Sequence, residues 1–210
     1  MGKRRKQAKN KTRQKAGNGI LDFGPVFFYT ARMQKAKKAK SVLTALFAAL
    51  ICAGCFIQIP IAGMIPVVLQ DMLAILAGLI LGPLYGTLAV FIFLLLGCIG
   101  LPVFSGAGGL AAITEGPTGG FLTGYLLGAL AGGLIAGKKS SVGWLRLSLA
   151  AAAANLTVFL CGAFRFSMLF PESDVWALAV LPFLPGTVLK LIFSVPAAKK
   201  FRIILARYYG

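Results

Sequence analysis

Residues 100–121 read GLPVFSGAGGLAAITEGPTGGF, an apolar stretch that contains seven glycines. These glycines, together with Pro102 and Pro117, are incompatible with one regular helix, because glycine is a poor helix former and proline ends or kinks a helix. Long hydrophobic runs precede and follow the stretch. It therefore predicts a deformable connection between two membrane-spanning helices.

The composition of the 210-residue chain indicates a membrane protein. Hydrophobic residues make up 58% of the chain, and its mean hydropathy is +0.85. Soluble globular domains contain only about 45–50% apolar residues. We therefore expect most of the chain to lie in a lipid bilayer.

The charge of the chain is strongly positive and unevenly distributed. There are 22 Lys and Arg residues against 5 Asp and Glu, and 13 of the 22 precede Ser41. Residues 1–34 are predicted to form a basic, disordered extension, in which the aromatic segment 20–30 is a candidate for the membrane interface. Residues 35–210 are predicted to form the membrane domain. The basic residues suit an anionic membrane surface better than a nucleic acid, and we expect no nucleic-acid partner.

Six segments are predicted to be transmembrane helices, because a helix needs ~20 apolar residues, with tolerance down to ~17, to cross the hydrocarbon core. Gly82 and Pro83 separate the second segment from the third. The sixth segment starts at a proline, which fits the first turn of a helix. The six predicted helices are 41–59, 66–81, 84–100, 118–137, 144–164 and 185–204.

The distribution of basic residues predicts the orientation of these helices. With the N-terminus in the cytoplasm, the inner segments hold the basic N-terminus, Lys138, Lys139, Arg146 and the basic C-terminus, whereas the outer segments hold only Arg165. This asymmetry follows the positive-inside rule. We therefore predict an all-α membrane protein with six helices and both termini in the cytoplasm. The glycine-rich stretch lies outside, between the third and fourth helices, and Arg165 is expected to anchor the fifth helix at the outer surface.

Ionisable residues inside a span are costly, by ~2.5–3.5 kcal/mol on insertion scales, and often mark functional sites. Asp71, next to Gln70 in the second helix, and Lys190 in the sixth are predicted at a similar depth in the outer half. Asn155 lies near the middle of the fifth helix. Two interpretations stay open: Asp71 and Lys190 pair to hold two helices together, or they line a ligand cavity. The two are compatible, because a pair in a cavity wall can exchange partners when a ligand arrives.

Several kinds of catalytic site are disfavoured by the composition. The chain has no histidine, which removes histidine bases, Ser-His-Asp triads and histidine-ligated metals. Cys52 and Cys55 form a CxxC, but this pair has no second pair of ligands and lies within an apolar run, where free cysteine behaves as a small hydrophobe. The composition therefore argues against a metal site and disfavours a redox role for the CxxC pair.

Ala45, Ala49 and Ala53 are spaced four residues apart on one face of the first predicted helix. Small residues at this spacing let another helix approach closely. The pattern serves either internal packing, which is the commoner case, or contact with a helix of another protein.

Four stretches together resemble the BioY family, the biotin-specific substrate-binding (S) subunits of energy-coupling-factor (ECF) transporters. They read VVLQDMLAILAGLILGPLYG (67–86), GLPVFSGAGGL (100–110), GPTGGFLTGYLLGAL (116–130) and LPFLPGTVLK (181–190). The resemblance extends from about residue 37 to residue 200.

The resemblance implies a bacterial plasma-membrane protein with six helices that enclose one biotin near the outer face. It implies that the chain is not an enzyme and needs no cofactor of its own. Transport then requires a transmembrane coupling subunit and two cytoplasmic ATPase subunits, which use the ATP. The resemblance also implies that the alanine-lined face of the first helix meets the coupling subunit.

The sequence departs from the family pattern at three positions. The family has PGDxxK near the sixth helix, whereas residues 185–190 read PGTVLK, so that Lys190 is kept and Thr187 replaces an aspartate. Phe121 stands where the family commonly has tyrosine, and Asp71 where it usually has a neutral residue. A carboxylate is thus missing from the sixth helix and present on the second at similar depth. We predict that Asp71 supplies the negative partner that Thr187 does not provide.

The resemblance suggests how these residues meet the ligand. Biotin requires an acceptor for its ureido N–H groups, a donor for its ureido oxygen and a cation or dipole for its carboxylate, and Asp71, Gln70 and Lys190 offer these types. Aromatic side chains are expected to contact the thiophane ring and the valerate chain, and the outer loop is expected to act as a lid, because glycine permits the necessary backbone changes. The predicted site comprises Lys190, Asp71, Gln70, Thr187, Phe104, Phe121, Tyr125 and Asn155, and the lid glycines are Gly106, Gly108, Gly109, Gly116, Gly119 and Gly120.

Three alternative functions remain. An S subunit for a different small vitamin is the first, because Thr187 breaks the family pattern. An integral-membrane enzyme is the second, and the lack of histidine and the few carboxylates argue against it. A channel or structural membrane protein is the third, which tight, saturable ligand binding would exclude.

Overall fold

The structure is a computed structural model that describes residues 23–59, 67–104, 108–137 and 142–209. The chain divides into two compact units, Met1–Lys37 and Lys38–Gly210. In the first unit the structure describes the beginning of one helix, α2, which starts at Phe23 within the predicted basic extension. The remaining elements belong to the second unit.

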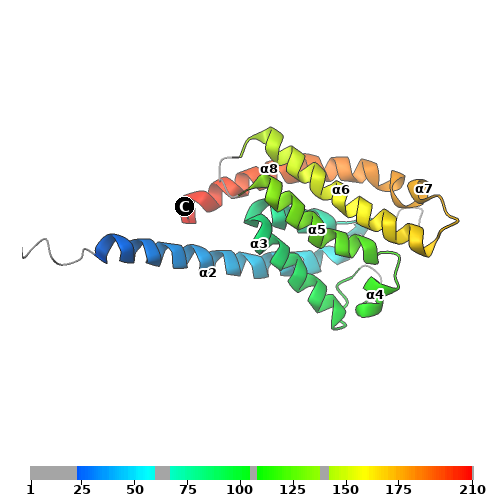
Figure 1. Cartoon of the computed structure of the whole chain (residues 1–210), viewed down its shortest axis with the longest axis horizontal. Coiled ribbons are helices and arrows are strands. Elements are labelled where there is room, and N and C mark those ends of the chain that lie inside the picture. Colours follow the sequence, from blue (N-terminus) through cyan, green and yellow to red (C-terminus); the bar gives the residue numbers. More distant parts are fainter. Residues whose placement is uncertain (1–22, 60–66, 105–107, 138–141, 210) are drawn as a thin grey trace, which may run out of the picture. The chain divides into compact units, whose positions relative to one another are not determined.

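The second unit is built almost entirely of helices. The two strands are two residues long and pair antiparallel, with Gln58 opposite Val68. The elements of the chain follow in the order α2 (Phe23–Ala53), the 3-10 turn η1 (Gly54–Phe56), β1 (Gln58–Ile59), β2 (Val67–Val68), α3 (Gln70–Cys98), α4 (Leu110–Thr114), α5 (Gly119–Ala136), α6 (Trp144–Leu169), α7 (Val175–Ala179), the 3-10 turn η2 (Leu181–Phe183) and α8 (Leu184–Tyr209) (Figure 1).

Five helices among the described residues are long and apolar enough to cross a membrane. One of them, α3, is broken at Gly82, whose φ of 84° favours glycine and whose ψ of −179° is the extended conformation that a residue before proline prefers. A β-carbon on Gly86 would lie 2.4 Å from the carbonyl oxygen of Ala77. In a straight helix these residues would be separated by about 13.5 Å along the axis, so the chain reverses at Gly82. The predicted break at Gly82 and Pro83 is therefore confirmed, as is the all-α membrane class.

The observed helix ends differ from the predicted ones where the chain leaves its apolar segment. The helix α5 matches the predicted fourth helix to within one residue at each end, and α6 begins at the predicted residue but continues to Leu169. The helix α8 continues through Pro196 to Tyr209. The helix α2 stops at Ala53, before the predicted residue 59, because Gly54 starts a 3-10 turn and Ile59 pairs with Val67.

The helix α6 shows the packing pattern expected of a membrane protein. Its inward face is lined by small residues, among them Ala150, Ala151, Ala154 and Gly162, all of which are buried. Because lipid is as apolar as leucine, close approach of small residues rather than burial of large ones drives helix association in membranes. The large side chains of α6 accordingly lie on its exposed face and comprise Leu145, Leu149, Leu156, Leu160, Phe164 and Met168.

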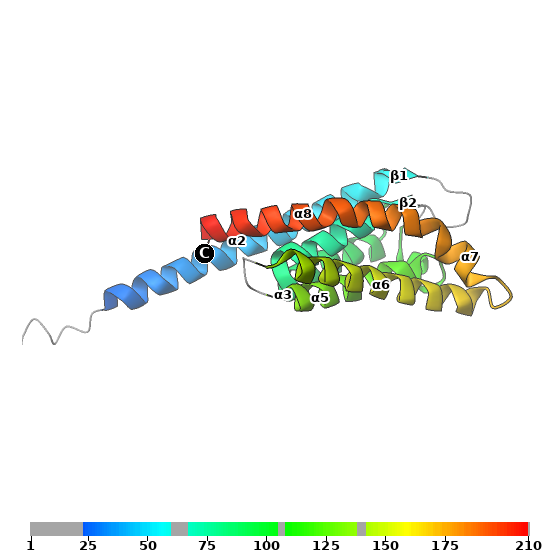
Figure 2. The same cartoon turned by 90° about the horizontal axis from the view of Figure 1, so that it is seen from above.

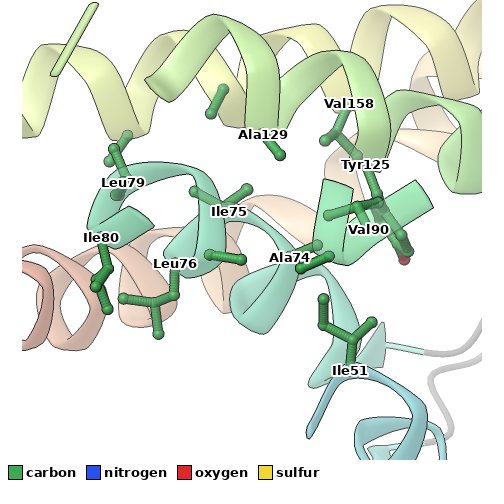
Figure 3. Close-up of a cluster of buried hydrophobic side chains, with 14 of the residues drawn as sticks. Ile51, Ala74, Ile75, Leu76, Leu79, Ile80, Val90, Tyr125, Ala129 and Val158 are labelled. Atoms are coloured by element: carbon green, nitrogen blue, oxygen red, sulfur yellow. The ribbon is translucent and has the colours of Figure 1, made fainter. Parts of the chain in front are cut away.

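The helix α5 contacts both α3 and α6, and their small residues allow the backbones to meet. A β-carbon on Gly78 of α3 would lie 2.3 Å from the carbonyl oxygen of Ala129 of α5. Figure 2 shows α5, α6 and α8 running along one another, and Figure 3 shows apolar side chains of α3, α5 and α6, including Ile75, Tyr125 and Val158, gathered in one cluster. This core fixes the helices on which the candidate site residues lie.

Candidate functional site

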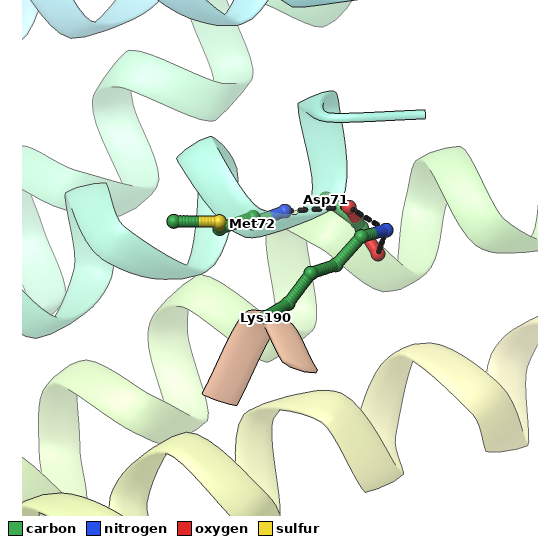
Figure 4. A network of polar contacts seen from close by, with 3 residues as sticks. All are labelled: Asp71, Met72 and Lys190. Atoms are coloured by element: carbon green, nitrogen blue, oxygen red, sulfur yellow. Dashed lines mark hydrogen bonds and ion pairs between the residues drawn. The ribbon is translucent and has the colours of Figure 1, made fainter. Parts of the chain in front are cut away.

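Asp71 and Lys190 form an ion pair between α3 and α8 (Figure 4). The Lys190 Nζ atom lies 2.8 Å from each carboxylate oxygen of Asp71, and Asp71 Oδ1 also accepts the backbone N–H of Met72 at 2.6 Å. Only 16% of the Lys190 side chain and 17% of the Asp71 side chain are exposed. The pairing, one of the two interpretations of the sequence, is thus present, while a contact of these residues with ligand stays a prediction.

Gln70 fixes the backbone around this pair. Its side chain is 1% exposed, and its Nε2 atom donates to the carbonyl oxygen of Ile51 at 3.2 Å and to that of Val103 at 2.6 Å. Gln70 thereby joins the end of α2, the start of α3 and the beginning of the glycine-rich stretch. The structure gives Gln70 a role in joining these three segments, which its position beside Asp71 alone did not indicate, and its contact with ligand stays a prediction.

The three predicted aromatic residues have different surroundings. Phe104 is buried against α3: its ring meets the Phe93 ring edge-on with centroids 5.4 Å apart, and a β-carbon on Gly97 would lie 2.0 Å from it. Phe121 packs over Gly162 of α6, and its ring centroid lies 6.1 Å from that of Phe183.

Tyr125, one turn after Phe121 on α5, is buried in the apolar cluster that also contains Ala74, three residues after Asp71 on α3 (Figure 3). The structure therefore brings Tyr125 close to the Asp71–Lys190 pair. Phe121 and Phe183 lie one helical turn further towards the start of α5.

Thr187 and Asn155 are positioned by their own helices. Thr187 is 8% exposed and precedes Lys190 by three residues, so that both lie on one face of α8. Asn155 is half-buried, and its Nδ2 atom donates to the carbonyl oxygen of Ala151, one turn back on α6, at 2.9 Å. The structure thus supports a shared location for Thr187 and Lys190.

The predicted lid is not one regular helix: it contains the short helix α4, Leu110–Thr114, and its last two glycines, Gly119 and Gly120, are the first residues of α5. The stretch returns to the end of α3, where the N–H of Gly109 donates to the carbonyl oxygen of Gly97 at 2.8 Å. Gly109 has a φ of 97°, a conformation that favours glycine. The lid glycines Gly108, Gly116, Gly119 and Gly120 lie among the described residues, and Gly106 lies outside them.

Arg165 of α6 holds the other end of α4. One of its terminal nitrogens donates a hydrogen bond to the carbonyl oxygen of Thr114, the last residue of α4. The sequence indicated only an anchor at the outer surface for Arg165. The contact with Thr114 connects α6 to the predicted lid.

The alanine pattern of α2 lies on the outside of the second unit. Ala45, Ala49 and Ala53 are all exposed, whereas Ala48 and Ile51 are buried. Small residues that served internal packing would be buried, so this arrangement favours the second interpretation of the pattern, contact with another protein.

Two further features lie apart from the predicted site. A groove of about 410 Å³ on α3 and α5 contains none of the predicted site residues and is lined by Pro83, Leu84, Thr87, Leu88, Phe91, Leu126 and Leu130. Cys52 and Cys55 are free thiols, and the described part of the chain contains no group of three side chains able to hold a metal ion.

The chain shares its sequence and its fold with known proteins. The sequence profile of the BioY family matches residues 30–207. The biotin transporter BioY of Thermotoga maritima is 40% identical over 154 residues, which cover 73% of this chain and 88% of the relative. The probable biotin transporter BioY of Pyrococcus horikoshii is 36% identical over 166 residues, which cover 79% and 98%.

A crystal structure of the S-component for biotin from an ECF-type ABC transporter has a related fold. Its TM-score is 0.70 at 30% sequence identity, and the match covers 79% of this chain and 92% of that one. The profile match spans most of the residues of the chain, and it includes α3, α5, α6 and the Asp71–Lys190 pair. The chain belongs to the BioY family.

Proposed function

We propose that this multi-pass membrane protein is the biotin-binding S subunit of an ECF-type transporter in a bacterial plasma membrane. It captures biotin on the outer face and delivers it through a transmembrane coupling subunit, while two cytoplasmic ATPase subunits hydrolyse ATP. The observation that carries the proposal is the largely buried Asp71–Lys190 pair in a chain of the BioY family.

An ion pair is well suited to a ureido group. The ureido group presents N–H donors beside a carbonyl oxygen, and the pair presents the Asp71 carboxylate beside the Lys190 ammonium, 2.8 Å apart. Asp71 accepts from a ureido N–H and Lys190 donates to the ureido oxygen. Because the ureido group is neutral, the two charges stay together when it binds.

The surrounding side chains supply apolar contact and closure. Tyr125 lies near Asp71. Phe121, whose ring packs beside that of Phe183, lies one turn of α5 closer to the lid. These rings suit the thiophane ring and the valerate chain of biotin. The lid, residues 108–120, closes over the ligand, and its glycines permit the backbone changes that opening and closing require.

Equilibrium binding to the purified full-length chain in nanodiscs tests the proposed function. We expect saturable binding of radiolabelled biotin with one molecule per protein, and competition by unlabelled biotin but not by a panel of other small vitamins. Absence of biotin binding, or tighter binding of another vitamin, would overturn the proposal.

Replacing Ala49 with tryptophan is expected to abolish biotin uptake while leaving biotin binding unchanged. Ala49 is exposed in the middle of the alanine-lined face, and an indole there prevents close approach of a helix of the coupling subunit. Uptake of radiolabelled biotin by cells that also contain the coupling and ATPase subunits measures transport, and binding to the purified variant shows that it is folded.

The matched control for Ala49 is Ala152→Trp. Ala152 is an exposed alanine of a different helix, α6, outside the alanine-lined face. We expect this variant to bind and transport biotin normally. Normal uptake by Ala49→Trp would show that the coupling subunit binds elsewhere.

A further inference from the structure

The Asp71–Lys190 pair leaves open how the carboxylate of the ligand is bound. Lys190 already contacts both oxygens of Asp71 at 2.8 Å. A second carboxylate at Lys190 would have to compete with Asp71 for the ammonium group and would be repelled by the Asp71 charge at close range. Both effects are large where little water is present. The pair therefore suits the neutral head of biotin better than its charged tail.

Arg165 is the basic side chain that the structure places beside the lid. One terminal nitrogen donates to Thr114 at the end of α4. Its Nε atom is buried and has no hydrogen-bond partner among the described residues. A buried donor without an acceptor is unfavourable, and a carboxylate oxygen is the strongest acceptor available to an arginine.

The acidic side chains around the lid leave this charge unpaired. Asp174 is engaged at the start of α7, where its Oδ1 atom accepts the N–H groups of Trp176 and Ala177. Glu115 and Glu172 are exposed, and within the described ranges neither lies within ion-pair distance of Arg165. An external anion can therefore bind the guanidinium without displacing an acid of the protein.

The position of Arg165 relative to the candidate site fits a ligand with a neutral head and an anionic tail. A β-carbon on Gly120 would lie 2.4 Å from Arg165 Cβ, so Arg165 lies beside the first turn of α5. From the start of α5 towards its end, Arg165 of α6 comes first, then Phe121, and then Tyr125 near Asp71. From Gly120 to Tyr125 the axis of α5 rises about 7.5 Å, so Arg165 and the Asp71–Lys190 pair lie at different levels along α5, as the two ends of an extended ligand require.

We propose that Arg165 binds the carboxylate of biotin while Asp71 and Lys190 bind its ureido group. This inference rests on the proposed function. The Arg165 guanidinium also donates to the carbonyl oxygen of Thr114 at the end of α4. A carboxylate bound to Arg165 therefore contacts the side chain that connects α6 to the lid. Arg165 is thus a specificity-determining residue that distinguishes an acid from its neutral derivatives.

Binding of biotin and of biotinamide, in which a neutral amide replaces the carboxylate, tests the inference. In the wild-type protein we expect biotinamide to bind about tenfold or more weakly than biotin, because a hydrogen bond to a charged group is lost. In Arg165→Gln we expect biotin to weaken to the level of biotinamide, while biotinamide binds as it does to the wild type. In Arg165→Lys, which keeps the charge, part of the preference for biotin is expected to remain.

Arg146→Gln is the matched control, because Arg146 lies on the same helix and also donates to a backbone carbonyl, that of Ile135, at 2.6 Å. We expect this variant to keep the wild-type preference for biotin. Loss of both ligands in Arg165→Gln would overturn the inference and make Arg165 a structural residue. Equal binding of biotin and biotinamide by the wild type would also overturn it. So would a result in which Lys190→Gln loses the preference for biotin over biotinamide and Arg165→Gln keeps it. Failure of the wild type to bind biotin would instead refute the proposed function.

Discussion

Replacing Lys190 with methionine is expected to abolish biotin binding and to lower the melting temperature of the protein. The Asp71 carboxylate is 17% exposed and has its cation in Lys190. Removal of one partner of a buried ion pair costs about 3–5 kcal/mol, because an uncompensated charge remains. Ligand affinity is expected to fall about 30-fold or more, since truncation of a buried charge pair costs at least about 2 kcal/mol of binding free energy, so almost no biotin binds at concentrations near the wild-type Kd. Equilibrium binding of radiolabelled biotin and thermal unfolding are measured on the same preparation.

A double variant separates the effect on stability from the effect on binding. Asp71→Asn combined with Lys190→Met removes both charges, so no unpaired charge is left inside the protein. We expect its melting temperature to return close to the wild-type value while biotin binding stays lost. Wild-type affinity in this double variant would show that the pair only holds α3 and α8 together.

Relocating the carboxylate tests whether Asp71 replaces the missing aspartate of α8. In Asp71→Asn combined with Thr187→Asp, the new carboxylate lies three residues before Lys190 on the same helix face, a spacing at which opposite charges interact. We expect this variant to be more stable than Asp71→Asn alone and to regain part of its biotin affinity. Asp71→Asn combined with Thr123→Asp, which places the charge at an exposed site on α5, is expected to regain neither. If the two double variants had the same stability and the same biotin affinity, Asp71 would not be acting in place of the missing aspartate at position 187.

The parts of the fold that could be predicted from the sequence are those dictated by backbone chemistry and by depth in the membrane. Gly82 and Pro83 break α3 because a residue with positive φ and a residue without an N–H cannot continue a helix. Asp71 and Lys190 meet because two opposite charges at similar depth lower their cost in lipid by pairing. Both inferences depend on a few residues and not on the packing of the whole chain.

The roles of Gln70 and Arg165 could not be predicted in the same way. Gln70 donates to carbonyl groups of Ile51 and Val103, which are far from it in the sequence and come together only in the folded chain. Arg165 contacts Thr114, the last residue of the helix α4, and a segment rich in glycine gave little reason to expect a helix there. In both cases the side chain donates a hydrogen bond to a backbone carbonyl group that only the tertiary structure brings within its reach.

Arg202 is the clearest example of a side chain that donates to backbone carbonyl groups far from it in the sequence. It belongs to the basic C-terminus, whose charges predict the orientation of the chain, yet it is only 6% exposed. Its two terminal nitrogens donate to the carbonyl oxygens of Leu79 and Gly137, each at 2.5 Å. In a regular helix the N–H four residues later would bind Leu79, but that residue is Pro83, which has no N–H. Arg202 supplies the missing donor and also satisfies the carbonyl group that follows the last turn of α5.

Replacing Arg202 with leucine is therefore expected to destabilise the fold by about 3–6 kcal/mol, because two hydrogen bonds to a charged group, each worth about 1.5–3 kcal/mol, are lost. Thermal unfolding of the purified protein measures the effect. Arg202→Lys is expected to lie between the wild type and Arg202→Leu, since a point charge cannot reproduce the forked geometry of a guanidinium. Arg207→Leu, an exposed residue in the last turn of the same helix, is the control and is expected to change stability by less than about 0.5 kcal/mol.

Biotin binding distinguishes this structural role from a role in ligand recognition. Leu79 lies two helical turns from Asp71 on α3, so the loss of Arg202 removes support from the broken end of the helix and not from its first turn. Below its melting temperature Arg202→Leu is expected to bind biotin with nearly wild-type affinity, whereas Lys190→Met is not. A wild-type melting temperature in Arg202→Leu would show that the Leu79 and Gly137 carbonyls find other donors. Normal stability with lost affinity would place Arg202 in the binding site, contrary to the geometry that joins it to the Leu79 and Gly137 carbonyls.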